Sequence, residues 1–165
     1  MGTHYVDKRE EALVKQIGEK LAKNELSAGT AESCTGGRIA SLLTSLPDSS
    51  DHFIGGIVSY SEDIKKSILG VSADTLEKYG VVSEPVAEQM ALGACRVLGC
   101  SCAVATTGLA GPEGDSSGNP VGTIWITAAV EGKVHSERFL FKGDRQEIVQ
   151  QSSWQALQML SEMLA

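Results

Sequence analysis

The first segment that could do chemistry is 30–37, which reads Thr-Ala-Glu-Ser-Cys-Thr-Gly-Gly and joins a strand pattern to a helix pattern. At such a junction the free amides of the first helical turn converge on one point, where they favour an anion or a developing oxyanion. Ser33 would lie at the mouth of this turn. The alternative interpretation is structural, because serine and threonine are also preferred N-cap residues. Four residues would supply the amides: Cys34, Thr35, Gly36 and Gly37.

A second candidate is the segment 60–65, Tyr-Ser-Glu-Asp-Ile-Lys. Tyr60 ends a strand pattern, and Lys65 falls in the first turns of the following helix pattern. An ammonium group there opposes the helix dipole, and partial burial would lower its pKa further, so that it could act as a base. The alternative is an exposed lysine that pairs with Glu62 or Asp63 on the surface.

Two further segments could hold a ligand. A buried strand pattern opens at Thr107 and Gly108 into a glycine-rich loop, which places backbone amides where α/β folds bind ligands. It is neither a P-loop nor a dinucleotide fingerprint, and a plain connecting loop is the alternative. Arg145 follows Asp144 at a helix start and could bind a phosphate with its forked guanidinium group; an exposed helix-start arginine is the alternative there.

The elements that would position these residues follow from hydrophobic periodicity. We expect strands near 27–32, 52–60, 102–106, 121–130 and 134–141, with Gly55 and Gly56 marking a bulge or a close backbone approach. Helices are expected near 7–26, 38–46, 62–69 and 74–79, then from about Ser83 and from about Asp144. Helices alternate with strands early and a hairpin comes late, which predicts a single α/β domain over 1–165 whose mixed sheet has helices on both sides.

Composition narrows the function classes. Fourteen basic against twenty-one acidic residues give a net charge of −7 without a Lys/Arg cluster, which argues against a nucleic-acid partner. Apolar runs are too short for a bilayer and the first residues lack a signal-peptide pattern, so we expect a cytoplasmic protein without a membrane partner. The four cysteines have neither a CxxC pair nor histidines at ligand spacing, so we expect no metal.

Six motifs in order carry a resemblance to a known family: TAESCTGG at 30–37, YSEDIK at 60–65, VSEPV at 82–86, TTGLAGPEG at 106–114, PVGT at 120–123 and GDR at 143–145. Together they resemble the CinA C-terminal domain family from about residue 8 to 162. The resemblance implies a three-layer α/β/α sandwich. It also implies hydrolysis of the amide of nicotinamide mononucleotide to nicotinic acid mononucleotide and ammonia, in pyridine nucleotide salvage, without a metal or other cofactor.

The resemblance also implies roles for single residues. Ser33 would be the nucleophile and Lys65 its base, an arrangement that activates a poor hydroxyl nucleophile. Ser50 and Tyr60 would complete the proton network. Three residues would hold the substrate: Thr107, Gly108 and Arg145.

One position departs from the family pattern, and two other functions remain open. Glu62 stands where relatives usually carry asparagine, and a carboxylate there would raise the pKa of Lys65 and weaken it as a base. The chain could instead be a catalytically silent nucleotide-binding member with a regulatory or DNA-uptake-linked role, or a hydrolase of another small amide. The oligomeric state, homo-oligomers included, is not set by the sequence.

Overall fold

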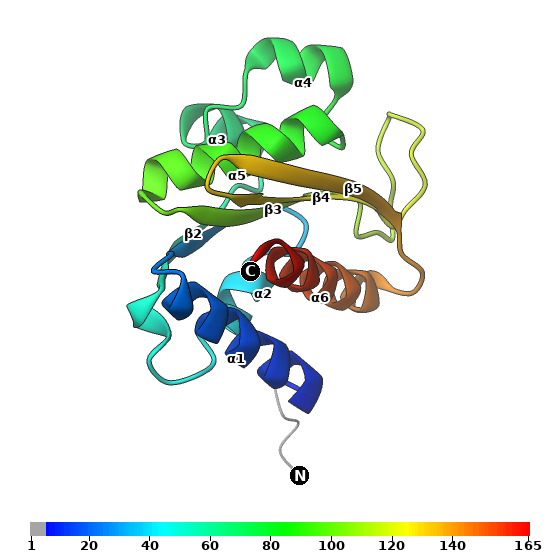
Figure 1. Cartoon of the computed structure of the whole chain (residues 1–165). Helices are drawn as coiled ribbons and strands as arrows, with labels where there is room; N and C mark the ends of the chain where they lie inside the picture. Colours follow the sequence, from blue (N-terminus) through cyan, green and yellow to red (C-terminus); the bar gives the residue numbers. More distant parts are fainter. Residues whose placement is uncertain (1–5) are drawn as a thin grey trace.

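The computed structural model describes residues 6–165, which form one five-stranded sheet flanked by helices (Figure 1). The strands are β1 (Ala28–Glu32), β2 (Phe53–Val58), β3 (Cys102–Gly108), β4 (Thr123–Val130) and β5 (Lys133–Leu140). The helices are α1 (Lys8–Lys23), α2 (Arg38–Leu43), the short 3-10 helix η1 (Ser49–Asp51), α3 (Glu62–Ser67), α4 (Ala73–Tyr79), α5 (Glu84–Leu98) and α6 (Arg145–Met163).

The sheet is mixed, as predicted. Its strand order is β2-β1-β3-β4-β5, with β1 parallel to both neighbours and β4 antiparallel to β3 and β5. Figure 1 shows α1, α2 and α6 on one face and α3, α4 and α5 on the other, which gives the predicted three layers. Every residue of β1 is buried, because a central parallel strand is covered on both faces.

The two faces of the sheet carry separate apolar cores. The larger joins α1, α2 and α6 to the sheet and includes Ile17, Ile39 and Leu157, which are fully buried. The smaller packs α5 against the opposite face through Val86 and Met90. Together these cores hold the ends of the strands in fixed register.

The glycine pair in β2 makes the predicted bulge and close approach. Ala28 of β1 pairs with Phe53, whereas Gly29 pairs with Gly55, so the register shifts by one residue. A Cβ on Gly56 would lie 2.3 Å from the side-chain oxygen of Thr30. Gly56 therefore leaves room for the Thr30 side chain, which a larger residue at position 56 would displace.

The parallel strands decide which residues can meet. Because β1, β2 and β3 run in the same direction, their carboxyl ends lie at one edge of the sheet. Ser33, Tyr60 and Gly108 lie at or just beyond these ends. Within 6–165, none of the helices has the length and apolar character that crossing a bilayer requires.

Candidate active site

Ser33 and Lys65 are in direct contact at this edge. Ser33 follows β1, and its backbone amide donates to the carbonyl of Thr106 at 3.1 Å. The Nζ of Lys65, from α3, lies 3.0 Å from the Oγ of Ser33 and donates to the carbonyl of Ser59 at 2.7 Å. Lys65 is 1% exposed and Ser33 8%. The predicted serine–lysine pair is therefore geometrically formed.

Burial is the largest influence on the pKa of Lys65. Loss of water around the ammonium lowers the pKa of Lys65, and this outweighs the raising effects of Cys34 and Glu62. Glu62 thus acts in the predicted direction, but its effect is smaller than that of burial. The helix-dipole argument was wrong, because α3 has only six residues and Lys65 lies in its last turn.

The alternative of an exposed, ion-paired lysine fits Lys66 and not Lys65. The ion pair expected of an exposed lysine is made by Lys66, whose Nζ lies 3.5 Å from Asp63 with the lysine side chain 42% exposed. Lys65 points the other way, into the molecule. Two adjacent lysines on a short helix thus have separate roles.

The turn at 33–37 is organised around Glu32, which is fully buried. Its carboxylate accepts hydrogen bonds from the amides of Ile39 and Ala40 at 2.9 and 3.0 Å and from the hydroxyl of Thr35 at 2.7 Å. These are the amides of the first turn of α2, so that turn holds an internal anion rather than an external one. Neither Ser33 nor Thr35 caps α2, because its N-cap is Gly37, without a side-chain bond.

Of the four amides predicted to face a ligand, three have no backbone acceptor. The amides of Cys34, Thr35 and Gly37 donate to no backbone carbonyl in the described part of the chain, whereas that of Gly36 donates to the carbonyl of Ser33 at 3.0 Å. Gly36 and Gly37 adopt left-handed φ values of 59° and 99°, so their function is to turn the chain. Of these four residues Cys34 borders the cavity beside Ser33, and substrate binding by any of them stays a prediction.

The Cys34 thiol is not a competing nucleophile. Burial raises the pKa of Cys34 to about 11, against smaller lowering effects that include a hydrogen bond to Thr106 and the charge of Lys65. At neutral pH the sulfur is therefore protonated, and a thiol is a much weaker nucleophile than a thiolate.

A cavity of about 340 Å³ opens beside Ser33 and Lys65, near the lower end of the size range of small-molecule sites. Its walls come from the turn after β1, the end of β2 with α3, the segment before α5, the loop after β3 and the start of α6. The lining residues are Ser33, Cys34, Tyr60, Glu62, Lys65, Val81, Val82, Gly108, Leu109, Ala110, Gly111, Glu113, Asp115 and Arg145.

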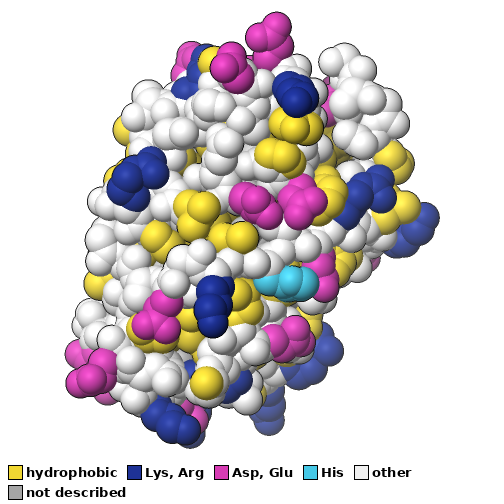
Figure 2. Space-filling model, turned by 45° about the horizontal axis from the view of Figure 1, so that its top comes forward, with side chains coloured by type: hydrophobic (Ala, Val, Ile, Leu, Met, Phe, Trp, Pro, Cys, Tyr) yellow, Lys and Arg dark blue, Asp and Glu magenta, His cyan; other side chains and the backbone are white. Residues whose placement is uncertain are grey.

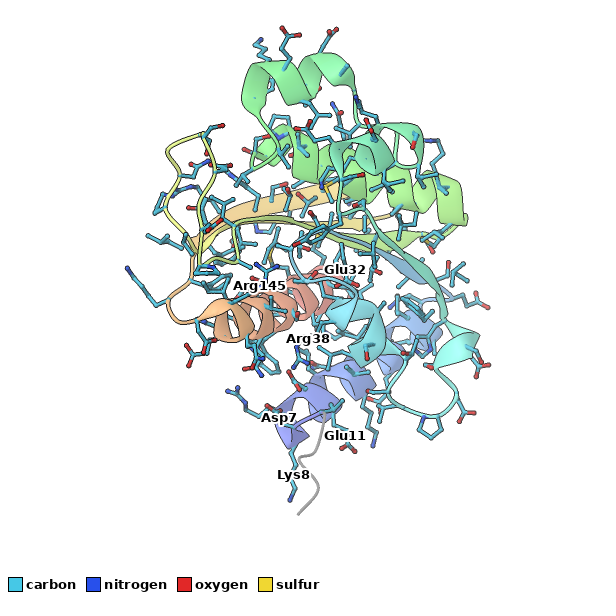
Figure 3. The ribbon with its side chains drawn as sticks, turned by 180° about the vertical axis from the view of Figure 1, so that it is seen from behind. Asp7, Lys8, Glu11, Glu32, Arg38 and Arg145 are labelled. Carbon is cyan, nitrogen blue, oxygen red and sulfur yellow. The ribbon has the colours of Figure 1, made fainter. Side chains whose placement is uncertain are left out.

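Arg145 ties three of these walls together. Its Nη1 donates to the carbonyl of Gly111 at 2.6 Å, and its Nη2 donates to the hydroxyl of Tyr60 at 2.9 Å. The helix start is fixed as predicted, since the Asp144 side chain accepts from the Glu147 amide at 2.9 Å in a capping box. Figure 3 shows Arg145 at the beginning of α6 and Glu32 where β1 meets α2.

The structure does not bring every predicted residue to the cavity. Thr107 is fully buried behind the wall, where its hydroxyl donates to the Val81 carbonyl at 2.9 Å. Thr35 is likewise turned inward, toward Glu32. Gly108 does line the cavity, and a Cβ there would lie 2.4 Å from the Thr123 carbonyl oxygen.

The prediction that Ser50 belongs to the proton network around Ser33 was wrong. It is an exposed residue of η1, before the amino end of β2, whereas Ser33 follows the carboxyl end of the parallel strand β1. The six residues of β2, about 20 Å of extended chain, separate the two edges. Ser50 of this chain therefore has no place in the proton network around Ser33.

Some contributors were not predicted from the sequence. Glu32 was missed, although a carboxylate in a strand of small residues was a visible signal of an internal polar contact. The Ser59 carbonyl was missed because a backbone acceptor leaves no signature in the sequence. Glu113 and Asp115, on the loop after β3, were considered only as part of a glycine-rich loop.

The strand ends, the buried pair and the cavity define a three-layer α/β protein with a serine–lysine site at the carboxyl edge of its sheet. Residues 10–164 match the family model described as the CinA C-terminal domain. The chain belongs to this family.

Known relatives are of two lengths. The nicotinamide-nucleotide amidohydrolase PncC of Escherichia coli K12 is 41% identical over 149 residues, which are 90% of each chain. A CinA-like protein of Thermotoga neapolitana is 42% identical over 96% of this chain but only 38% of its own length. The chain thus spans about a third of the length of such longer relatives.

Solved structures share the fold. A competence-damaged protein (CinA) superfamily protein from Enterobacter cloacae superposes with a TM-score of 0.93 at 33% identity, covering 100% of this chain and 99% of that one. The competence/damage inducible protein CihA from Agrobacterium tumefaciens superposes with a TM-score of 0.91 at 38% identity, covering 96% and 97%.

Proposed function

We propose that this protein is a nicotinamide-nucleotide amidohydrolase, which converts nicotinamide mononucleotide to nicotinic acid mononucleotide and ammonia. The observation that carries the proposal is the 3.0 Å contact between Lys65 Nζ and Ser33 Oγ at a cavity wall, with the lysine pKa lowered by burial. The PncC relative of similar length supports the choice of substrate.

In the first half-reaction, Ser33 Oγ attacks the carboxamide carbon while its proton passes to the neutral amine of Lys65. The carbonyl oxygen becomes an oxyanion, for which the unpaired amides of Cys34 and Thr35 are the nearest backbone donors in sequence. The Lys65 ammonium then gives the proton to the leaving nitrogen. Ammonia departs, and an ester joins Ser33 to the substrate's acyl group.

In the second half-reaction, water attacks this ester and Lys65 takes the proton of the water. The tetrahedral intermediate collapses, the C–O bond to Ser33 breaks, and the proton returns to the serine oxygen. The Ser59 carbonyl accepts from Lys65 at 2.7 Å and so keeps the amine directed at the reacting oxygen through both steps. The proton exchanged between Ser33 and Lys65 therefore moves over the 3.0 Å hydrogen bond that joins them.

Arg145 is proposed to hold the substrate phosphate. The residue lines the cavity, and the Gly111 carbonyl and Tyr60 hydroxyl each use one N–H of its guanidinium group. A guanidinium carries five N–H groups, so others remain for a charge-assisted bond to an anion. Tyr60 orients the arginine through this contact, and because it lines the same cavity as Ser33 and Lys65, its predicted part in the proton network belongs to this proposal.

The test is ammonia release from nicotinamide mononucleotide by the full chain and by Ser33→Ala. The variant should lose turnover and no longer form an acyl-enzyme, which intact mass after an acid quench would detect in the wild type. Cys34→Ala is the matched control and should keep most activity, since its thiol is protonated at neutral pH. Wild-type binding without ammonia release would favour the silent nucleotide-binding function instead.

A further inference from the structure

The cavity carries more negative charge than an amide hydrolysis site requires. Glu62, Glu113 and Asp115 line it together with Lys65 and Arg145. The Asp115 carboxylate is engaged within its own loop, where it accepts from the amide and hydroxyl of Ser117. Over residues 6–165, Glu62 and Glu113 accept no hydrogen bond and enter no ion pair of 4 Å or less. Two exposed residues of the cavity lining therefore carry carboxylates without a direct partner.

The charge of Glu62 opposes the proposed role of Lys65 as a base. Its charge raises the pKa of Lys65, which opposes formation of the neutral amine that the base needs. A cation bound near Glu62 would cancel this effect. A ligand with a positive charge therefore removes an effect on the Lys65 pKa that a neutral ligand would leave in place.

We propose that Glu62, with Glu113, selects ligands whose ring is a cationic pyridinium over those with a neutral ring. The inference rests on the proposed function, because the positive ring of nicotinamide mononucleotide is the charge that the carboxylates would meet. That substrate has a positive ring at one end and a negative phosphate at the other. The cavity likewise has carboxylates and the cationic Arg145 in its lining. The overall charge of −7 alone would repel the phosphate, so local charges must set the orientation.

The same carboxylates discriminate against the product. Hydrolysis replaces a neutral carboxamide with a carboxylate on the same ring, so like charges then lie on the ligand and on the wall. Product binding is therefore weakened relative to substrate binding, which favours release.

The test measures binding in the Ser33→Ala protein, where substrate is not consumed. Its probes are nicotinamide mononucleotide and the reduced form, which keeps the carboxamide and phosphate but has a neutral ring. Adding Glu62→Gln should raise the Kd of the cationic form about fivefold. That factor is about 1 kcal/mol, the interaction of two unit charges about 4 Å apart in water. The Kd of the reduced form should not change.

Asp63→Asn is the matched control. It removes the same charge from the next residue of α3, where the carboxylate is 91% exposed and lies outside the cavity lining. Asp63→Asn should leave the Kd of the cationic form and the Kd of the reduced form unchanged. Glu62→Gln should also reduce the ratio of the product Kd to the substrate Kd. Equal shifts for the cationic and reduced forms, or the same shift in Asp63→Asn, would overturn the inference, as would failure of both forms to bind. Preferential binding of the cationic ring by a wild-type protein that releases no ammonia would refute only the proposed function.

Discussion

Replacement of Lys65 by methionine tests the base assignment most directly. Methionine has a similar length and suits a site with 1% exposure, so the change removes the amine and little packing. In the wild type the Ser33 oxygen has Lys65 Nζ at 3.0 Å. Loss of a general base lowers the rate about 10²–10⁴-fold, which is about 3 to 5 kcal/mol of transition-state stabilisation. Because the pair is buried, bulk water replaces the amine poorly, and we expect the upper part of that range.

The pH dependence gives the assay a second readout. The base must be neutral, so kcat/KM should rise with pH through the pKa of Lys65, and burial places that limb below the usual lysine value of 10.5. Lys65→Met should lose this limb. Folding stability follows the same pKa. Between the lowered folded value and the usual unfolded value the unfolded chain binds more protons, so wild-type stability should rise with pH there more steeply than that of the variant.

Lys66→Met is the control for both readouts. It removes an exposed lysine from the same short helix, and its ion pair with Asp63 at 3.5 Å contributes little stability. Ammonia release by Lys66→Met should match that of the wild type at every pH. A folded Lys65→Met protein with more than about a tenth of wild-type kcat/KM would refute the assignment, since general-base loss is larger than that.

Arg145→Ala should raise KM for nicotinamide mononucleotide about tenfold to hundredfold, as expected for one charge-assisted hydrogen bond, with a smaller effect on kcat. Nicotinamide riboside, which lacks the phosphate, should be equally poor for both proteins; equal damage to both substrates would instead make Arg145 structural. Glu32→Gln leaves one oxygen for two amides and should lower the free energy of unfolding by about 1.5–3 kcal/mol in urea titrations. It should also lower kcat more than it raises KM, and an unchanged kcat would show that the turn does not need the carboxylate.

The fold was largely predictable because most helices and strands have a hydrophobic periodicity, a capping residue or a glycine signal in their own sequence. The strand patterns at 121–130 and 134–141, the helix start at Asp144 and the glycine pair in β2 are local signals that predicted elements the structure contains. The alternating burial expected of the two strands is not seen, because β4 is buried almost throughout and β5 is mostly exposed. Boundaries were less exact. The second helix ends at Leu43 rather than 46, and α3 ends at Ser67 rather than 69.

The site was only partly predictable, because its properties depend on which elements meet. That Lys65 is buried, and Lys66 exposed, depends on how α3 packs against the turn after β1. Family resemblance paired Lys65 with Ser33 correctly but also added Ser50, which the topology removes. Since β1 and β2 are parallel, residues before β2 must lie at the edge opposite Ser33, and a parallel-strand prediction could have excluded Ser50 from the sequence.

The contacts of Glu32 explain how a carboxylate can adjoin Ser33, the proposed nucleophile, without raising the pKa of Lys65, the proposed base. A lysine paired with a buried carboxylate has a raised pKa and remains an ammonium. Here the Glu32 charge is balanced by the amides of Ile39 and Ala40 and by Thr35, and the ammonium of Lys65 is turned instead to Ser33 and to a neutral carbonyl. Burial of Lys65 then outweighs the opposing charges of Cys34 and Glu62, and the pKa of Lys65 falls. The first turn of α2 therefore contributes to the proposed chemistry indirectly, by keeping an anion away from the base.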